Sequence, residues 1–498
     1  MNLKQLIETL GKAEVEGTVD REIIGIAYDS RSVTPNKLFI ALRGSSVDGH
    51  NYIRTVAEKG ASAVICEQKG PVYKGMTRII VPDSRKAMPL IAAEFYGHPA
   101  DKLDMIGVTG TNGKTTVTFL CKAILEKEGI RSGLLGTIRY EIDERMIPAQ
   151  RTTPEAPDIQ SMLSKMVYAG VKSCVMEVSS HALAQGRVGG ICFNTGVFTN
   201  LTQDHLDYHG SMENYFECKK RLFQMGFEKN PSFKAVINID DAAGRKLSEI
   251  FADKEFVFTY GLNSKAMIYA DEVKLFSDYT QMKIYLPQGS FWIKIPMVGR
   301  FNVLNVLAAV GVGLAHRISP DRIIAALEKA PLIPGRLERI VAGQPFTVLV
   351  DYAHTDDAMR NVLETLKELK KGKILTVFGC GGSRDKGKRF KMGAVAAEYS
   401  DYTIITSDNP RHEKPLDIAL QVEKGYRSIR EDGYEVELDR ALAIERGIRA
   451  AQPEDIVLIC GKGHETYQEF DGVLLPFDDR LQAYSALSSL NYCREEEN

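Results

Sequence analysis

One short stretch of this chain restricts its possible folds more than any other. Residues 107–116 read Gly-Val-Thr-Gly-Thr-Asn-Gly-Lys-Thr-Thr, with an apolar strand pattern before them and an apolar helical pattern after them. A loop of this kind turns backbone N–H groups toward phosphate oxygens at a helix N-terminus, where negative charge is favoured. Lys114 would reach the β- and γ-phosphates of a nucleotide, and the Thr115 hydroxyl would bind Mg²⁺. Val108 stands where the strict pattern has its first glycine, but the Gly-Lys-Thr context still predicts a nucleotide site rather than a turn that binds nothing.

Strand-like runs alternate with helical segments along the chain, which predicts an α/β fold. The runs in the second and last thirds are continuously apolar, as in parallel strands that are covered on both faces. The expected strands are Ile23–Ala27, Leu38–Leu42, Ala63–Cys66, Ser173–Val178, Thr195–Phe198, Ala235–Ile239, Thr347–Val350, Ile374–Phe378, Tyr402–Thr406 and Ile456–Cys460.

The length and two turn signals predict the domain organisation. A chain of 498 residues has room for roughly three domains of about 150 residues each. Gly97–Ala100 forms one turn signal and Pro334-Gly335 the other, so we place boundaries near residues 101 and 335. The predicted domains are a substrate-binding domain over 1–101, a central domain with a phosphate loop and a parallel sheet over 102–335, and a Rossmann-like domain over 336–498.

Composition argues against several classes of protein. The chain has 63 Lys and Arg residues against 65 Asp and Glu, so its charge gives no sign of a nucleic-acid or membrane partner. No apolar run reaches the ~20 residues that span a bilayer, and the first residues lack the apolar core of a signal peptide. The eight cysteines include no Cys-x-x-Cys pair and are predicted to be reduced thiols. We therefore expect a cytoplasmic protein without nucleic-acid or membrane partners.

Polar residues follow two strands of the predicted central sheet. Glu177 lies near the end of one strand and is followed by Val-Ser-Ser-His181, and the next strand leads into Asp204–Gly210, which contains His205 and His209. A carboxylate at the carboxyl end of a strand, beside a phosphate loop, is well placed to bind Mg²⁺. Each histidine taken alone is more often a loop or hydrogen-bonding residue. Their grouping after consecutive strand ends favours a metal and phosphate site.

Lys219 lies on a predicted helix with Tyr215, Phe216, Leu222 and Phe223 at positions i−4, i−3, i+3 and i+4, which places it on the apolar face. Desolvation disfavours an ammonium group, and a neutral amine can react with CO₂ to form a carbamate. A carbamate is an anionic oxygen ligand suited to Mg²⁺. The alternative is a lysine whose stem lies along apolar surface while its ammonium reaches solvent, and spacing alone favours that alternative.

The phosphate loop, the Glu177–His181 and Asp204–Gly210 segments and the Lys219 helix together resemble the bacterial Mur ligase family, over essentially the whole chain. The resemblance implies an ATP-dependent amide ligase of peptidoglycan synthesis, needed for cell shape and division, with ATP and Mg²⁺ as cofactors; we expect a monomer. It implies that Lys219 is carbamylated. The implied catalytic residues are Lys114, Glu177, His205 and Lys219, and the implied Mg²⁺ ligands are Thr115, Glu177, His205 and carbamylated Lys219.

The resemblance also implies two further sets of binding residues. Small hydroxyls and an arginine suit a polyanionic substrate such as UDP-N-acetylmuramoyl-L-alanyl-D-glutamate. For that substrate the implied contacts are Ser30, Ser45, Ser46, Val47, Thr152, Thr153, Ser179, Gln185 and Arg187. For ATP they are Gly110, Thr111, Asn112, Gly113, Lys114, Thr115, Thr116, Asn302, Arg336 and Asp351.

The choice of amino acid depends on Ser407-Asp408-Asn409-Pro410-Arg411, which follows a predicted strand. In isolation Asp-Asn-Pro is a turn signal. Within the family it resembles the motif that recognises meso-diaminopimelate, which differs from lysine by a distal carboxylate that Arg411 can bind, whereas lysine ends in an ammonium group alone. The implied amino-acid contacts are Arg384, Asp408, Asn409, Pro410, Arg411, Gly461 and Glu465.

The implied reaction joins meso-diaminopimelate to the D-glutamyl γ-carboxylate through an acyl phosphate. Three alternatives remain open: the lysine-adding ligase of the same family, a folylpolyglutamate synthase, and a phosphate-loop ATPase that is not a ligase. The residues do not single out a general base. His181 and His209 are candidates, each more often structural.

Overall fold

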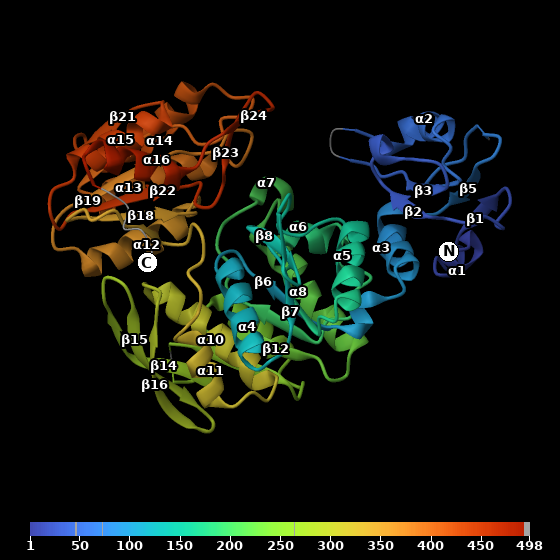
Figure 1. Ribbon diagram of the computed structural model, residues 1–498, viewed down its shortest axis with the longest axis horizontal. Helices are drawn as coiled ribbons and strands as arrows, with labels where there is room; N and C mark the ends of the chain where they lie inside the picture. Colours follow the sequence, from blue (N-terminus) through green and yellow to red (C-terminus); the bar gives the residue numbers. More distant parts are fainter. Residues whose placement is uncertain (45–46, 72, 263, 493–498) are drawn as a thin grey trace. The chain divides into compact units, whose positions relative to one another are not determined.

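The computed structural model describes residues 1–44, 47–71, 73–262 and 264–492 (Figure 1). Contacts within the chain divide it into two compact units. Unit 1 comprises Met1–Thr109, Gly129–Val197 and Glu217–Ala235, and unit 2 comprises Gly110–Glu128, Phe198–Phe216 and Val236–Asn498. The predicted domain boundaries near residues 101 and 335 divide the chain differently and stay predictions. Within the described residues, no helix has the length and apolar character needed to cross a membrane.

Unit 1 contains a five-stranded sheet in the order β1-β5-β4-β3-β2, in which β2 to β5 are parallel and β1 is antiparallel. Its parallel strands read as apolar runs because helices cover both faces. Its elements are β1 Glu14–Glu16, β2 Gly25–Ala27, β3 Lys37–Ile40, β4 Ala63–Cys66, β5 Thr77–Ile80, α1 Leu3–Glu8, α2 Ile53–Glu58, α3 Ser84–Phe95 and the 3₁₀ turns η1 Ser30–Ser32, η2 Gly49–Tyr52 and η3 Pro99–Lys102.

Unit 1 also contains the strands that precede the phosphate loop. β10 pairs in parallel with both β6 and β7, and β8 pairs antiparallel with both β7 and β9. The register places Glu177 beside Val108, so the end of β10 lies next to the end of β6. These elements are β6 Asp104–Thr109, β7 Ser132–Leu135, β8 Arg139–Ile142, β9 Arg145–Pro148, β10 Ser173–Glu177, α5 Ala156–Tyr168 and α6 Ser180–Ala184; β11 Thr195–Phe198, α8 Met212–Lys229 and β12 Lys234–Asn238 have residues in both units.

Unit 2 contains the helix that follows the phosphate loop and an antiparallel extension that the sequence did not predict. β14, β15 and β16 form an antiparallel meander, and β13 pairs in parallel with β14. Helix α10 is apolar around its whole circumference and is almost completely buried, as expected of a core helix. The elements are α4 Lys114–Lys127, α7 Leu206–His209, α9 Ala242–Ile250, β13 Val257–Gly261, β14 Ile268–Leu275, β15 Thr280–Leu286, β16 Gly289–Ile295, α10 Arg300–Ala315 and α11 Pro320–Leu327.

The last part of unit 2 is a six-stranded sheet in the order β17-β18-β22-β19-β20-β21, drawn in orange and red in Figure 1. All strands are parallel except β17. Alternate side chains enter two apolar cores, one with α12 to α14 and one with α15 and α16. The elements are β17 Glu338–Ile340, β18 Thr347–Asp351, α12 Asp356–Leu369, β19 Ile374–Phe378, α13 Gly387–Tyr399, β20 Tyr402–Ile405, α14 Pro415–Arg427, β21 Tyr434–Val436, α15 Arg440–Ala450, β22 Ile456–Cys460 and α16 Asp479–Ser489. A separate antiparallel pair, β23 Tyr467–Phe470 and β24 Val473–Pro476, lies between β22 and α16 in the chain.

The register of this sheet brings the predicted binding residues to one edge. Cys460, the last residue of β22, pairs with Asp351 at the end of β18 and with Phe378 at the end of β19. Phe378 in turn pairs with Ile405, the last residue of β20. The loops that follow these four strands therefore start at the same level, at the carboxyl edge where open parallel sheets bind ligands.

Candidate functional site

At two positions, the phosphate loop in unit 2 has a backbone conformation and a close packing that favour glycine. Gly110 and Gly113 have φ angles of 149° and 86°. A Cβ atom on Gly110 would lie 1.8 Å from Oγ1 of Thr199, and one on Gly113 would lie 2.3 Å from Oδ1 of Asn305. Thr199 Oγ1 donates to the carbonyl of Asn112 at 2.6 Å, which fixes the loop. The loop is therefore packed closely enough that its backbone conformation is determined by its neighbours.

Lys114 is the first residue of α4 and reaches back over the loop. Its Nζ donates to the carbonyl oxygens of Gly110 and Thr111 at 3.1 and 2.8 Å. This ammonium group lies at the helix N-terminus beside the loop, where a nucleotide phosphate would be favoured. A bound phosphate would accept hydrogen bonds from the same N–H groups of Lys114 that donate to the two carbonyls. The geometry is consistent with the predicted role of Lys114.

Residues from the C-terminal sheet region contact this loop within unit 2. Arg336 donates from Nη2 to Oγ1 of Thr115 at 3.1 Å and lies over the ring of Tyr352, 4.9 Å from its centroid. Asn112 donates from Nδ2 to Oδ2 of Asp357 at 2.8 Å. A cation and a carboxylate that are distant in sequence thus border the phosphate loop. A phosphate contact by Arg336 stays a prediction.

Asp351 ends β18 and is 5% exposed. Its carboxylate accepts from the backbone N–H groups of Leu337 and Ala353, both at 2.7 Å. Burial raises the pKa of Asp351, while Arg336 and these two donors oppose the rise. The carboxylate therefore fixes the segment that carries Arg336. A ribose contact would use its remaining lone pairs and stays a prediction.

Asn302 lies in the first turn of α10 and is buried. Its Nδ2 donates to the carbonyl of Val298 at 2.8 Å, and its Oδ1 accepts from Nδ2 of Asn305 at 3.0 Å. Because Asn305 also lies against Gly113 of the phosphate loop, Asn302 and the loop share one polar cluster. An adenine contact by Asn302 stays a prediction.

His205 has a left-handed backbone, with φ 54°, and its side chain is 42% exposed. Its Nε2 lies 3.3 Å from Oδ2 of Asp204. Although burial favours the neutral acid, the pKa of Asp204 is lowered because His205, His354 and Lys388 surround it. A non-glycine residue in this backbone region is often found at functional sites.

His209, one candidate general base, has a different environment from His205. It is buried and stacks on Tyr215, with ring centroids 4.9 Å apart and an interplanar angle of 28°. This packing is what a structural histidine shows. His181 lies in α6 of unit 1, and its role stays a prediction.

Two of the predicted metal-site residues lie in unit 1. Glu177 is 1% exposed, and its carboxylate accepts from the backbone N–H and the hydroxyl of Thr137 at 2.7 and 3.0 Å. Lys219 is 1% exposed, and its four predicted apolar neighbours on α8 are buried with it. Within the described part of the chain, no group of three or more His, Cys, Asp or Glu side chains forms a ready metal site. Carbamylation of Lys219 and Mg²⁺ binding by these residues stay predictions.

The residues predicted to hold the muramoyl dipeptide form one network in unit 1. Thr153 donates from Oγ1 to the carbonyl of Glu177 at 2.8 Å and accepts from the N–H of Ser179 at 3.0 Å. Arg187 donates to the carbonyl of Thr153 at 2.8 Å and to Oε1 of Gln185 at 2.8 Å. Thr137 donates from Oγ1 to the hydroxyl of Thr152 at 3.0 Å, and Arg187 also pairs with Glu155 at 3.1 Å.

The N-terminal part of this predicted site is less well defined. Ser45 and Ser46 lie outside the described residues. Val47 is 54% exposed, and Ser30 lies in the short turn η1. Tyr28 donates to Oδ2 of Asp158 at 2.5 Å, so the strand end before this turn is attached to helix α5. The uridine contacts stay predictions.

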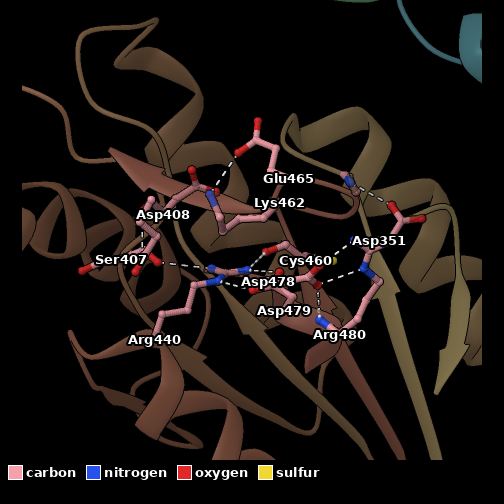
Figure 2. A network of polar contacts seen from close by, with 12 residues as sticks. Asp351, Ser407, Asp408, Arg440, Cys460, Lys462, Glu465, Asp478, Asp479 and Arg480 are labelled. Carbon is pink, nitrogen blue, oxygen red and sulfur yellow. Dashed lines mark hydrogen bonds and ion pairs between the residues drawn. The ribbon is translucent and has the colours of Figure 1, made fainter. Parts of the chain in front are cut away.

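The predicted amino-acid site lies at the carboxyl edge of the C-terminal sheet (Figure 2). Asn409 donates to Oε2 of Glu465 at 2.9 Å, and Lys462 donates to the same oxygen at 2.9 Å and to Oδ1 of Asn409 at 3.0 Å. Burial raises the pKa of Glu465, and Lys462 opposes that rise. Lys462 also lowers the pKa of Asp408 against the effect of burial. The two acids thus share one buried cation.

Arg411 borders the same site. Its backbone is left-handed, with φ 53°, and its side chain donates to Oε2 of Glu469 at 3.0 Å and to the carbonyl of Gly382 at 2.8 Å. Gly382 lies two residues before Arg384, so the loops that carry the two predicted arginines are in contact. Pro410 is buried in the turn, and Arg384 is exposed. Arg411 and Glu469 together present both signs of charge, which suits a zwitterionic amino acid.

The sequence analysis missed three residues that these sites depend on. Lys462 is fully buried between two predicted contacts, Asn409 and Glu465. Asp357 contacts the phosphate loop from α12, and Arg440 lies beneath the amino-acid site. Asp357 and Arg440 lie at the N-termini of their helices, and the local sequence there does not indicate a contact with a distant part of the chain. For Lys462, the glycines on either side were the available signal.

A phosphate loop bordered by residues of a second parallel sheet, with a charged site at that sheet's carboxyl edge, defines a nucleotide-dependent enzyme that acts on an amino acid or peptide. Three family models match the chain: the Mur ligase middle domain over residues 108–313, the Mur ligase glutamate ligase domain over 335–463, and the Mur ligase family catalytic domain over 22–96.

A curated relative from Geobacter metallireducens, named UDP-N-acetylmuramoyl-L-alanyl-D-glutamate--2,6-diaminopimelate ligase, is 44% identical over 99% of both chains. A solved structure with the same name is 34% identical, with a TM-score of 0.69, and covers 99% of this chain and 100% of its own. The structure of MurF ligase from Thermotoga maritima in complex with ADP is 20% identical, with a TM-score of 0.65 over 88% of this chain and 93% of its own, and shows the fold alone. The chain belongs to the Mur ligase family, whose members are ATP-dependent amide ligases, and it has the three-domain α/β architecture of that family.

Proposed function

We propose that this chain attaches meso-diaminopimelate to UDP-N-acetylmuramoyl-L-alanyl-D-glutamate with ATP and Mg²⁺, as a monomer in the cytoplasm. The observation that carries the proposal is the amino-acid site, where Asn409, Lys462 and Glu465 form one buried network beside Arg411. Diaminopimelate has two carboxylates and two amines, so it needs a site with both signs of charge. The name of the relative at 44% identity supports the same substrates.

In the first step, an oxygen of the D-glutamyl γ-carboxylate attacks the γ-phosphorus of ATP. The O–P bond forms, the bond to the β-phosphate oxygen breaks, and an acyl phosphate and ADP result. Lys114 and Arg336, which border the phosphate loop, would balance charge on the transferred group. Arg187 and its neighbours would hold the substrate in unit 1 so that its carboxylate is presented.

Mg²⁺ would bind the phosphate oxygens and balance the charge that develops during transfer. By the family resemblance, its ligands are Thr115, Glu177, His205 and the carbamate of Lys219. Hydroxyl, carboxylate and carbamate oxygens are hard donors of the kind Mg²⁺ prefers. Burial of Glu177 and Lys219 to 1% exposure fits groups that function in a water-poor site.

In the second step, an amine of diaminopimelate attacks the acyl carbon. The C–N bond forms, the tetrahedral intermediate expels phosphate, and the amine loses a proton. Glu465 would pair with an ammonium group and Arg411 with the distal carboxylate. Most of the acceleration would come from holding the amine in line with the acyl phosphate.

A lysine-adding ligase is the nearest alternative, and Arg411 argues against it. Lysine and diaminopimelate share the distal amine, but lysine carries a hydrogen where diaminopimelate carries its distal carboxylate. With lysine bound, the guanidinium of Arg411, which also contacts Glu469 at 3.0 Å, would face the distal ammonium without the carboxylate that pairs with it. We therefore expect a strong preference for diaminopimelate.

The test is a competition assay. Purified protein is incubated with ATP, Mg²⁺ and the UDP-muramoyl dipeptide, and equal concentrations of diaminopimelate and lysine are offered together. Mass spectrometry of the product should show the diaminopimelate adduct in at least tenfold excess. A lysine adduct in excess would replace the proposal with the lysine-adding ligase. A folate product in a parallel reaction, or ATP hydrolysis at full rate without the dipeptide, would support the other two alternatives.

A further inference from the structure

A fully buried ion pair lies beneath the amino-acid site in Figure 2. Arg440 begins α15 and Asp479 begins α16, and both side chains have no exposed surface. The guanidinium forms a fork with the carboxylate, with Nε to Oδ1 and Nη2 to Oδ2 both at 2.7 Å. The predicted substrate contacts do not include either residue.

The remaining donors of Arg440 reach two strand ends. Nη1 donates to the carbonyl of Ser407 at 3.2 Å, and Nη2 donates to the carbonyl of Cys460 at 2.9 Å. Ser407 directly precedes Asp408, and Cys460 directly precedes Gly461, so each carbonyl belongs to the peptide bond that leads into a predicted contact. Arg440 therefore contacts both loops of the amino-acid site from below.

Among the described strands, no β-ladder joins these two loops directly. The two loops follow β20 and β22, which are separated in the sheet by β19. The space between the loops is narrow, since a Cβ atom on Gly461 would lie 2.7 Å from Oδ2 of Asp408. A small change in loop separation would therefore alter the shape of the site.

A buried ion pair is a weak source of stability, because the loss of hydration offsets its attraction. Two apolar side chains would fill the same space without the loss of hydration, so stability alone does not account for the pair. What apolar side chains could not replace are the hydrogen bonds from the guanidinium to the two strand-end carbonyls. We propose that Arg440, fixed by Asp479, is a positioning residue that sets the separation of the Asp408 and Gly461 loops and thereby the preference for an amino acid with a distal carboxylate. The proposal rests on the proposed function.

The test uses the full-length protein with two variants. Arg440→Met combined with Asp479→Leu removes both buried charges together, because removing one alone would leave an unpaired charge. Arg440→Lys keeps the charge but cannot form the fork and reach both carbonyls. Arg446→Met is the matched control, since Arg446 lies on the same helix and pairs instead with Glu435 and Glu437.

In both variants we expect the KM for diaminopimelate to rise at least tenfold and the ratio of kcat/KM for diaminopimelate over lysine to fall by a similar factor. The KM values for ATP and for the UDP-muramoyl dipeptide should stay within twofold, and the control should match the wild type. A folded variant with unchanged KM and unchanged ratio would overturn the inference. An equal rise in all three KM values would also overturn it, because that is the effect of a general structural defect.

Hydrogen exchange separates this inference from the proposed function. In Arg440→Lys, amides of residues 406–411 and 460–465 should both exchange faster than in the wild type, while those of β19 should not. Unchanged exchange in either loop would contradict the positioning role. If the wild type forms no product at all, the proposed function fails, whereas the exchange result still decides whether Arg440 holds the two loops.

Discussion

At the scale of single residues, the burial of Lys219 bears most strongly on the chemistry. The helical spacing alone favoured a lysine that reaches solvent, but the side chain is 1% exposed. Desolvation disfavours the ammonium form of a lysine, and the neutral amine is the form that reacts with CO₂. A carbamate removes the positive charge and creates an oxygen ligand.

We predict that Lys219→Ala lowers kcat by about a hundredfold or more, since even partners of a metal ligand contribute 10- to 100-fold. Acetate or propionate should restore part of the activity, because a free carboxylate can occupy the place of the carbamate. Initial rates with and without added acid measure the effect. Lys220→Ala is the control, since Lys220 pairs with Glu217. Absence of rescue by any short acid would argue against the carbamate.

A second residue-scale prediction concerns Glu413. The pKa of its carboxyl is lowered to about 2, chiefly by hydrogen bonds from Arg389. A carboxyl whose folded pKa lies below its unfolded value of 4.5 stabilises the fold above pH 4.5, and this stabilisation is lost as the pH falls toward 2. Urea unfolding at pH 7 and pH 3.5 should therefore show a smaller loss of stability in Glu413→Gln than in the wild type.

The control for that measurement is Glu431→Gln, which removes an exposed ion pair with Arg427 and should leave the pH dependence unchanged. Parallel pH curves for the wild type and Glu413→Gln would show that Arg389 does not lower this pKa.

At the scale of elements, the sequence predicted the parallel strands best. β4, β11, β19 and β22 begin and end at the predicted residues, because short buried strands bounded by turn residues leave a clear pattern. The meander of β14 to β16 was missed. In β14 the alternation of apolar and polar residues is interrupted at Asp271 and Glu272, where the register also shifts before Lys274.

The residues of the candidate sites also differ in how well the sequence predicts them. Residues in continuous motifs, such as Lys114 and Asp408, could be found because each motif is local. The contacts of Arg440 with two separate strand ends could not be predicted, because they depend on the order and register of the strands in the sheet, which no local sequence pattern indicates. The family resemblance supplied roles for many residues but not the contacts that hold them.

The element-scale prediction concerns the contact between the phosphate loop and the segment after β11. In Gly110→Ala the new methyl group would collide with Thr199 and the φ of 149° would be strained, so the loop must move. We expect kcat/KM for ATP to fall by about a hundredfold, the effect of a shift of about 1 Å. Gly129→Ala is the control, since that glycine also has a positive φ but has no neighbour within 4 Å. Similar small losses in both variants would contradict the close packing seen here.

At the scale of the whole molecule, the nucleotide site joins distant parts of the chain. Arg336 and Thr115 are 221 residues apart, and Asn112 and Asp357 are 245 residues apart. Arg336 and Asp357 come from the predicted C-terminal domain, so residues of that domain contact the phosphate-loop segment within unit 2. Binding of nucleotide and folding of this region should therefore be coupled.

We predict that Arg336→Ala raises the KM for ATP about tenfold or more, since a hydrogen bond to a charged group contributes at least ~1.5 kcal/mol. The KM for diaminopimelate should change little. Steady-state kinetics with each substrate varied in turn measures both. Arg339→Ala, on the exposed side of β17, should resemble the wild type. A larger effect on diaminopimelate than on ATP would mean that Arg336 serves the other site.

The central claim is that a peptide carboxylate takes up phosphate before an amine displaces it. The most direct measurement uses UDP-muramoyl dipeptide labelled with ¹⁸O in both oxygens of the D-glutamyl γ-carboxylate. We predict that each phosphate released carries one ¹⁸O and that the new amide keeps the other. Unlabelled phosphate, released while both labelled oxygens stay on the dipeptide, would contradict it.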